Sequence, residues 1–343
     1  MGISPWIWRG LALGALSFGA ALGLYAAGPP LGQGEVRALA ISAGPVALDS
    51  SDPARDTLGR LRFLGGLKLA APDRQFGGLS ALLWDGRCQR LLAVTDTGSF
   101  LVLVPQEAGD RLTGVSAAFI APILDARGAP PANKREADAE SLSRDPGTGA
   151  ITVWYEGRAR ASVHEGLDPC RESTLALPAT AERRLAPMAG WPVNGGPEAV
   201  ADAPGRTILI SEEAGPGPDR RWLLDVEGSR IAIRQLLLED PAFVPTALDL
   251  LEPGPPAVFL MLARHFSPMT GVAVRLDSLT LGPGLLRTDP IATFRAPLAT
   301  DNFEGLAVRR EGGRTFLYLV SDDNFSNAQQ TLLLKFELLA AGS

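Results

Sequence analysis

The sequence predicts an all-β fold in which one small sheet is repeated, and three observations support this prediction. The 343 residues are 46% hydrophobic and 20% charged, which is typical of a globular chain with a core. The 38 glycines and 28 prolines indicate frequent turns and argue against long helical bundles. The third observation is a pattern of two short strands joined by a turn, which recurs along most of the chain.

The N-terminal region contains a run of small and apolar residues at 10–27, directly after the cation Arg9. Such a run is typical of an export signal or a membrane anchor, so we expect residues 1–28 to be one of these and to form a hydrophobic helix. With Arg9 on the inner side, the rest of the chain lies outside the cytoplasm, in the periplasm or cell envelope. The Pro- and Gly-rich residues 29–59 are expected to be a linker, and residues 60–340 to form one domain.

Five copies of the repeated pattern can be aligned. Each copy has a strand of small residues, a turn, and an apolar strand that ends at a charged residue. The aligned position of the first strand is held by Ser80, Glu140, Glu198, Thr246 and Glu304. Successive positions are 60, 58, 48 and 58 residues apart, and further β-rich segments indicate four strands per copy. Repeated four-stranded antiparallel sheets of about 50 to 60 residues predict a β-propeller.

The two ends of the repeated region complement each other. The last copy ends after its third strand, residues 331–338, whereas a strand at residues 61–69 precedes the first copy and has no copy of its own. We expect these two strands to pair, because this closes the ring and removes an exposed sheet edge. The count is then five blades, or six if one blade is degenerate.

The aligned copies also bring acidic residues to equivalent places. Inner strands of a propeller line one central channel, so the aligned residues of all blades converge there. The second strand of each copy ends at Asp96, Glu156, Glu212, Arg264 and Asp322, respectively. We therefore expect a ring of carboxylates at one mouth of the channel. Such a ring requires bound cations, raised pKa values or neutralisation by Arg158 and Arg264.

Three functional interpretations and one structural interpretation fit this ring. Calcium prefers six to eight oxygen ligands, and Asp322, Asp323 and Asn324 form a run rich in such oxygens. A pair of carboxylates can act as general acid and base on an ester or phosphoester. The ring can also attract a cationic ligand. In the structural interpretation, the acids only cap turns by accepting backbone N–H bonds.

Other chemistries have no signature in the sequence. The net charge of -6 argues against nucleic acid as a partner, and no phosphate-binding glycine motif follows a predicted strand. Ser80 lacks the second glycine of a nucleophile elbow. His265, at a predicted strand end, is a candidate for a channel role, whereas His164 is expected in a turn. Cys88 and Cys170 can pair if the chain is exported, but we expect two separate buried thiols.

Seven segments of the chain form a set with a recognisable order. They are GGLSAL at 77–82, AVTDTGSF at 93–100, DAESLS at 138–143, GPEAVA at 196–201, LARHFSP at 262–268, DNFEGLAV at 301–308 and LVSDDNFSNAQQTLLLKFEL at 319–338. Together they resemble the phytase-like family described by an "esterase-like activity of phytase", over about residues 60–339. This resemblance implies an exported β-propeller that hydrolyses phosphate or carboxylate esters. The similarity to calcium-dependent propeller phytases implies Ca²⁺ as a cofactor.

The sequence thus predicts an exported, monomeric propeller that acts as a metal-dependent hydrolase on small-molecule phosphoesters or related esters. The expected catalytic residues are Glu304, Glu198, Glu140, Arg264 and His265. The expected Ca²⁺ ligands are Asp96, Glu156, Glu212, Asp322, Asp323 and Asn324. Contact with a membrane is expected only through the N-terminal segment. The alternative is a propeller without catalytic activity that binds a ligand or a partner protein at the cell envelope.

Overall fold

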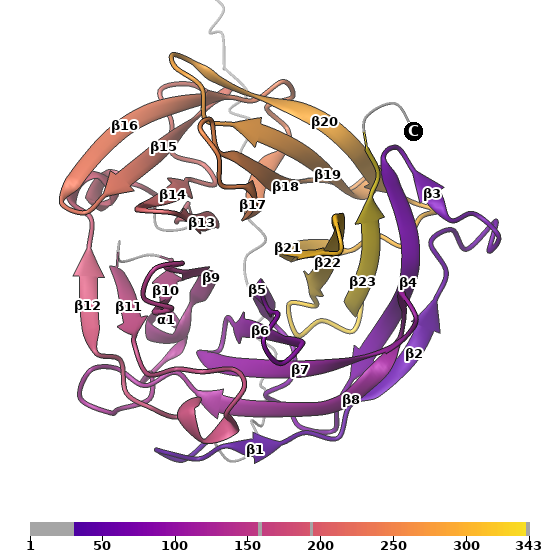
Figure 1. Cartoon of the computed structure of the whole chain (residues 1–343), viewed down its shortest axis with the longest axis horizontal. Coiled ribbons are helices and arrows are strands. Elements are labelled where there is room, and N and C mark those ends of the chain that lie inside the picture. Colours follow the sequence, from indigo (N-terminus) through magenta and orange to yellow (C-terminus); the bar gives the residue numbers. More distant parts are fainter. Residues whose placement is uncertain (1–30, 157–159, 193–194, 341–343) are drawn as a thin grey trace, which may run out of the picture.

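The computed structural model describes residues 31–156, 160–192 and 195–340. Within these ranges the chain is almost entirely β-structure, and the strands form sheets that surround a common centre (Figure 1). The predicted signal or anchor, residues 1–28, lies outside the described residues. Among the residues that are described, no helix is long and apolar enough to cross a membrane.

Five antiparallel meanders of four strands each make up the described fold, and we number them in chain order. Meander 1 contains β5 (Leu79–Asp85), β6 (Arg90–Thr95), β7 (Ser99–Ala108) and β8 (Arg111–Pro122). Meander 2 contains β9 (Ala139–Arg144), β10 (Ile151–Tyr155), β11 (Arg160–His164) and β12 (Ala181–Arg184). Meander 3 contains β13 (Ala199–Ala203), β14 (Arg206–Ile210), β15 (Arg220–Glu227) and β16 (Arg230–Leu237). Meander 4 contains β17 (Val244–Glu252), β18 (Val258–Ser267), β19 (Gly271–Thr280) and β20 (Leu286–Arg295).

Meander 5 combines the two ends of the chain. Its strands are β21 (Asn302–Glu311), β22 (Arg314–Asp322), β23 (Thr331–Leu338) and the early strand β4 (Leu61–Ala70). Strands β23 and β4 are antiparallel, with register from Leu338 opposite Leu61 to Thr331 opposite Leu69. The pairing predicted from the sequence is therefore confirmed. It closes the ring, because neither strand then presents a free edge to solvent.

The segment that precedes the ring contributes strands as well. Strand β1 (Arg37–Ala38) pairs with β8, and both β2 (Ser42–Val46) and β3 (Thr57–Leu58) pair with β4. This differs from the linker expected over residues 29–59, because much of that segment is hydrogen-bonded into the sheets. The physical reason is that β8 and β4 are outer strands, whose exposed backbone groups gain partners when another strand covers them.

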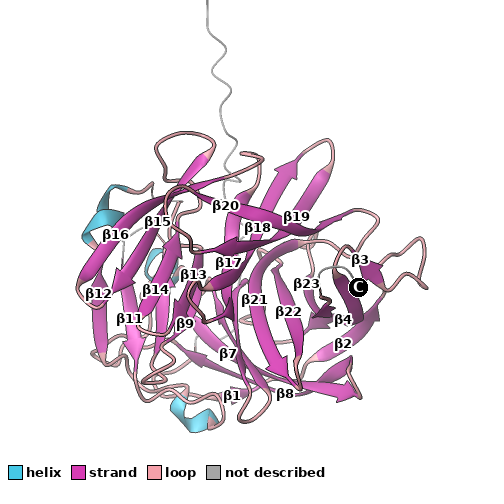
Figure 2. Ribbon diagram, turned by 45° about the horizontal axis from the view of Figure 1, so that its top comes forward, coloured by secondary structure: helices cyan, strands magenta, loops and turns pink. Residues whose placement is uncertain are grey.

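The inner strands form a ring around the axis. Each of the five first strands contacts its two neighbours, in the order β5, β9, β13, β17, β21 and back to β5. Figure 1 shows these strands nearest the centre, and Figure 2 shows the sheets side by side around the ring. Radial repetition of antiparallel sheets about one axis is the β-propeller architecture.

Apolar side chains fill the space between neighbouring meanders. Five buried clusters are found among the described residues, and each one joins two adjacent meanders. In β6, Leu91 and Ala93 face meander 5, whereas Leu92 and Val94 face meander 2. A sheet that is buried on both faces reads as a continuous apolar run rather than an alternating one. This explains the uninterrupted apolar strands in the sequence.

The connections between strands range from tight turns to the longer segments 123–138 and 165–180, and one of them is cross-linked. They include the helix α1 (Lys134–Ala137) and the 3₁₀ turns η1 (Glu172–Thr174) and η2 (Ala186–Gly190). Cys88, in the turn after β5, forms a disulfide with Cys170, which lies after β11, with Cα atoms 5.6 Å apart. The expectation of two separate thiols was therefore wrong. The pairing depends on how meanders 1 and 2 pack, which a separation of 82 residues does not disclose.

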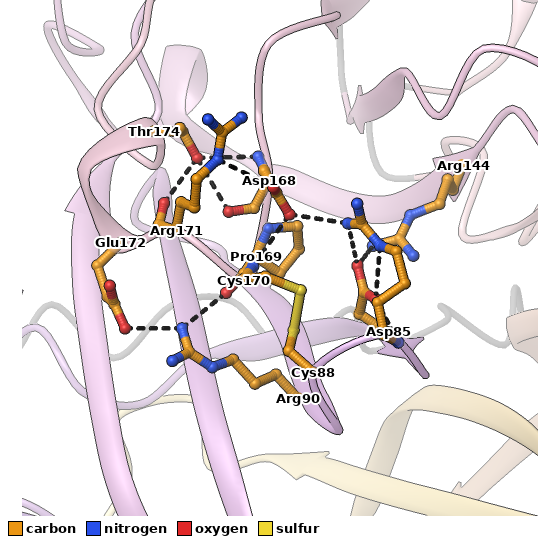
Figure 3. Close-up of a disulfide and its surroundings, with 11 residues drawn as sticks. Asp85, Cys88, Arg90, Arg144, Asp168, Pro169, Cys170, Arg171, Glu172 and Thr174 are labelled. Carbon is orange, nitrogen blue, oxygen red and sulfur yellow. Dashed lines mark hydrogen bonds and ion pairs between the residues drawn. A yellow bond between two sulfur atoms is a disulfide. The ribbon is translucent and has the colours of Figure 1, made fainter.

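Charged side chains surround this disulfide, as Figure 3 shows. Asp168 accepts the backbone N–H of Cys170 at 3.1 Å, and it also receives a hydrogen bond from Arg171. Asp85, in meander 1, forms an ion pair with Arg144 of meander 2 at 3.1 Å. The disulfide and this ion pair together hold the first two meanders at their outer corner.

Candidate functional site

The backbone confirms the alignment of the five copies. In meanders 1 to 3, a residue one or two positions after the second strand donates its N–H to the carbonyl two positions before the aligned residue. These bonds join Asp96 to Gly78 at 2.9 Å, Glu156 to Asp138 at 3.0 Å and Glu212 to Gly196 at 3.1 Å. In meanders 4 and 5 the corresponding residues are ladder partners, Arg264 with Val244 and Asp322 with Asn302. Five equivalent pairs therefore surround one mouth of the ring.

A local irregularity of the inner strands affects the aligned side chains. In meanders 1, 2, 4 and 5 the ladder between the first two strands has a β-bulge at the aligned position. These residues are Ser80, Glu140, Thr246 and Glu304. A bulge leaves one residue unpaired and changes the direction of its side chain, and it is common next to active sites. In meander 3, Glu198 immediately precedes β13.

Glu140 and Glu198 are buried, and neither has a partner among the described residues. They are 8% and 7% exposed, and neither carboxylate has a hydrogen bond or ion pair with any residue that the structure describes. Glu198, together with Glu304, lines the narrow central space between the inner strands. Burial raises the pKa of both groups well above the usual value. Neighbouring negative charges raise it further, and the largest of these contributions comes from Glu304 for Glu140 and from Glu140 for Glu198. Such groups favour a proton or a cation.

Glu304 and Asp322 of meander 5 lie at the same mouth. Glu304 accepts a hydrogen bond from the side-chain amide of Asn302 at 2.8 Å, and burial raises its pKa although Arg264 opposes the shift. Asp322 accepts the backbone N–H of Asn324 at 2.6 Å. Burial and then the charge of Glu304 raise the pKa of Asp322 well above its usual value. Both carboxyls therefore tend to hold a proton when no cation is near.

Two cations offset part of this negative charge. Arg264 Nη2 lies 3.5 Å from Glu212 Oε1, and despite burial the surrounding carboxylates, led by Glu304, raise the Arg264 pKa. Lys134 of α1 lies 2.8 Å from Asp96 Oδ2 and 3.4 Å from an oxygen of Asp138. Burial and then the charge of Asp138 raise the pKa of Glu156 to about 8. Among the described residues, the cations at the mouth are fewer than its acids. The sequence also predicted Arg158 as a neutralising residue, and it lies outside the described residues.

Two groups of three carboxylates have the spacing of cation ligands. In each group, one carboxylate oxygen from every member lies within 4.8 Å of the others. The first group is Asp138, Glu140 and Glu156, and the second is Glu156, Glu198 and Glu212. An all-oxygen donor set with two partnerless members fits a hard divalent cation such as Ca²⁺. We call these five residues the carboxylate centre.

The remaining predicted residues lie around this centre rather than in it. Asp323 accepts hydrogen bonds from the backbone of Gly78 at 3.0 Å and of Phe325 at 3.1 Å, so it caps a turn. Asn324 is exposed. His265 Nδ1 lies 3.1 Å from the Ala242 carbonyl oxygen, and its ring packs on Phe243. Within the described residues, no hydrogen bond joins His265 to the carboxylate centre.

His164 lies elsewhere. It was expected in a turn, but it is the last residue of β11 and is 1% exposed. Its Nε2 lies 2.9 Å from the Ser162 hydroxyl, which lies 2.9 Å from the Tyr155 hydroxyl. Burial lowers the pKa of His164 to about 4, so the ring is neutral at physiological pH. This histidine supports packing between meanders 1 and 2, because its ring also contacts Phe100 edge-on.

Sequence reasoning missed two residues that the structure brings to the mouth. Asp138 lies two positions before the aligned Glu140, and extending each copy upstream by two residues would have found it together with Asn302. Lys134 belongs to the connection between meanders 1 and 2, which has no counterpart in the other copies. No repeat-based signal could have indicated it.

Fold and site define a β-propeller whose axial mouth is rich in buried carboxylates. The chain belongs to the Phytase-like family, because the family model described as "Esterase-like activity of phytase" matches residues 74–325. A comparison with curated proteins finds no match.

Weak likenesses to solved structures are also found. The Malassezia sympodialis allergen Mala s 1 is 13% identical, with a TM-score of 0.40 over 82% of this chain and 91% of that chain. A glucose dehydrogenase is 13% identical, with a TM-score of 0.41 over 82% and 99%. The exo-β-1,3-galactanase 1,3Gal43A of Clostridium thermocellum is 9% identical, with a TM-score of 0.41 over 88% and 70%. Likenesses of this strength carry no information about activity.

Proposed function

We propose that this protein is an exported, monomeric propeller that hydrolyses phosphoesters or related esters of small molecules at its acidic mouth, with Ca²⁺ as cofactor. Each of the five meanders is then one blade. One observation carries the proposal: Glu140 and Glu198 are buried, lack partners among the described residues and belong to two groups of oxygen ligands. A structural carboxylate would accept backbone N–H bonds, as Asp323 does.

The carboxylate centre would hold the cation. Glu156 belongs to both groups, so it would contribute to binding together with Glu140 on one side and with Glu198 and Glu212 on the other. A bound Ca²⁺ supplies positive charge that neutralises the carboxylates and polarises the ester group. The negative mouth disfavours a highly charged polyanion such as phytate, unless several cations bind first. Monoesters of low charge are the better substrates.

Arg264 and Glu304 supply the remaining chemistry. The Nε of Arg264 is buried and has no hydrogen-bond partner in the described structure, so it can donate to an ester or phosphate oxygen. Burial raises the pKa of Glu304, which favours a role as proton donor, and the hydrogen bond from Asn302 fixes its orientation. In the reaction, water adds to the phosphorus or acyl carbon, the bond to the alcohol oxygen breaks, and Glu304 gives that oxygen its proton. The proton that the attacking water loses then restores Glu304.

The disulfide supports the proposed location. Disulfides form and persist in oxidising compartments such as the periplasm and the cell exterior. The bond between Cys88 and Cys170 fits the export that the N-terminal run of apolar residues predicts.

One feature favours the alternative of a binding protein without turnover. The central space between the inner strands has a volume of about 10 Å³, and apolar residues such as Leu82, Leu142 and Leu306 line it beside Glu198 and Glu304. This space is too small for a substrate, so a ligand would be held outside it, at the mouth. A mouth can retain a ligand without transforming it, and only an assay of turnover separates the two functions.

The test measures release of phosphate and alcohol from simple phosphomonoesters, phytate and carboxyl esters, with Ca²⁺ and with chelator. We expect calcium-dependent turnover that Glu304→Gln lowers by about 10²-fold or more, with the melting temperature unchanged. The exposed Glu239→Gln is the matched control. No turnover on any substrate would favour the binding protein, and unfolding of Glu304→Gln would identify a structural carboxylate.

A further inference from the structure

A cavity of about 290 Å³ lies between meander 2 and the start of meander 3. Its walls come from the end of β10, from the segment of β12 and η2, and from the chain that precedes β13. Among the described residues that line it are Tyr155, Arg184, Leu185, Met188, Trp191 and Gly196. Its volume is at the lower end of the range for ligand pockets, so it fits one ring rather than a large molecule.

The cavity adjoins the carboxylate centre through Gly196. The carbonyl of Gly196 accepts the backbone N–H of Glu212 at 3.1 Å. A Cβ atom on Gly196 would lie 3.2 Å from Glu156 Cα and 3.3 Å from its Cγ, so this glycine packs directly on Glu156. Glu198 follows two residues later. One wall of the cavity therefore contacts Glu156 and Glu212 of the second ligand group, and the chain leads from it directly to Glu198.

The lining is apolar and aromatic, unlike the mouth. Met188 and Leu185 are buried in the apolar cluster between meanders 2 and 3, and Trp191 packs against that cluster. Tyr155 belongs to the lining at the end of β10, but its side chain packs in the cluster between meanders 1 and 2. Arg184 is the only charged residue among the described residues of the lining. The indole of Trp191 offers a flat contact surface to another ring.

We propose that this cavity binds the aromatic alcohol portion of the substrate while its ester group lies at the carboxylate centre. This inference rests on the proposed function and narrows its substrate class to aryl esters and aryl phosphoesters. An inositol polyphosphate does not fit the lining, because one arginine cannot match many phosphates. An aryl group gains apolar burial that a methyl group cannot gain.

The experiment compares the binding of phenyl phosphate and methyl phosphate to the full chain, by calorimetry and ligand-observed NMR, with Ca²⁺ and with chelator. We expect phenyl phosphate to bind about tenfold more tightly than methyl phosphate. Ala189→Phe adds a ring to an exposed lining residue and is expected to abolish this preference without weakening methyl phosphate. Trp191→Ala tests the same preference by removing a wall. Ala108→Phe, at an exposed position of β7 in meander 1, is the matched control.

Each outcome decides one claim. Loss of the phenyl preference in Ala189→Phe or Trp191→Ala, with Ala108→Phe unchanged, supports the cavity assignment. Equal affinity for both esters, or binding of neither, overturns it. A phenyl preference that persists while Ca²⁺ has no effect on binding or turnover would leave the cavity assignment in place and contradict the proposed function instead.

Discussion

Glutamates in two regions of this protein differ in how their charge is compensated. At the seam between meanders 1 and 5, Glu107 accepts hydrogen bonds from Lys335 at 2.7 Å, from Arg309 at 3.0 Å and from the hydroxyl of Tyr318. Although burial raises its pKa, the bonds from Lys335 and Tyr318 hold the pKa of Glu107 below the usual value. We call this group the seam cluster.

At the mouth, glutamates lie in an environment that lacks such donors among the described residues. Glu140 and Glu198 have no partner in the described structure, and burial raises their pKa values. The seam cluster shows that this fold supplies three donors to a glutamate that is only half-buried. Leaving two glutamates without donors is a cost to the metal-free fold. The difference points to a ligand that completes the mouth.

The largest expected effect is loss of stability at the seam cluster. Glu107→Ala leaves the ammonium of Lys335, which is 0% exposed, without its carboxylate. Removing one partner of a buried ion pair typically costs about 3–5 kcal/mol of unfolding free energy, which urea unfolding measures. Calcium affinity should remain within about twofold, because the seam lies outside the carboxylate centre. A loss below about 1 kcal/mol would mean that the pairing is unimportant.

The next effect concerns binding at the mouth. Glu198→Gln should weaken Ca²⁺ binding by about 10²-fold, because removing even an outer partner of a metal ligand costs 10- to 100-fold. In chelator, the unfolding free energy of this variant should equal or exceed that of the wild type, since an unpaired buried charge is gone. The exposed Glu165→Gln is the control. If Glu198→Gln loses as much unfolding free energy in chelator as Glu107→Ala does, Glu198 stabilises the fold in the same way as Glu107.

The stability that the mouth contributes and the stability that the seam cluster contributes change in opposite directions with pH. Carboxyls with raised pKa hold more protons in the folded state, so their contribution to stability is complete below about pH 4.5 and is lost as the pH rises through the folded pKa. These pKa values are about 7 for Glu212 and about 8 for Glu156, where burial is the main cause in both. The metal-free protein should therefore lose stability between about pH 5 and pH 8. The lowered pKa of Glu107 acts in the opposite sense, and its contribution is lost in acid.

Calcium should reduce this loss of stability at high pH, because it binds the ionised carboxylates and releases their protons. Urea unfolding at a series of pH values measures how the unfolding free energy changes with pH, once with Ca²⁺ and once with chelator. An identical pH dependence in the two conditions would contradict a cation site at the mouth.

The smallest expected effect comes from Lys134, whose positive charge offsets part of the negative charge of the mouth. Its ammonium lies 2.8 Å from Asp96 and 3.4 Å from Asp138, a member of the carboxylate centre. Lys134→Met should strengthen Ca²⁺ binding about three- to fivefold, which corresponds to an exposed ion pair worth about 1 kcal/mol. The exposed Lys68→Met should change nothing. Weaker Ca²⁺ binding in Lys134→Met would show that this lysine orders the site instead of competing with the cation.

Much of this architecture could be predicted from the repeated pattern. The recurrence of Glu140, Glu198 and Glu304 identified the inner strands, because residues at equivalent positions of a closed ring must converge. The closing pair of strands followed from an unpaired strand at each end of the repeated region. Both predictions rest on periodicity, which a single sequence displays directly.

Features without a repeat could not be predicted in this way. Lys134 reaches the mouth from a connection that only one copy has, and the disulfide depends on the packing of two meanders. His265 follows Arg264 within β18, and successive residues of a strand face opposite sides. The ring of His265 packs on Phe243. The aryl-sized cavity is likewise formed by irregular segments around η2, for which the sequence pattern gives no geometry.

The most direct test of the account is a calorimetric titration of the chelator-treated protein with Ca²⁺ near neutral pH, in buffers of different ionisation enthalpy. We predict saturable binding accompanied by proton release, weakened about 10²-fold in Glu198→Gln and retained in Glu165→Gln. Proton release is required because ligand carboxyls with raised pKa must ionise when a cation binds. No calcium binding by the folded wild-type protein would contradict the claim that the partnerless acids of the mouth form a metal centre.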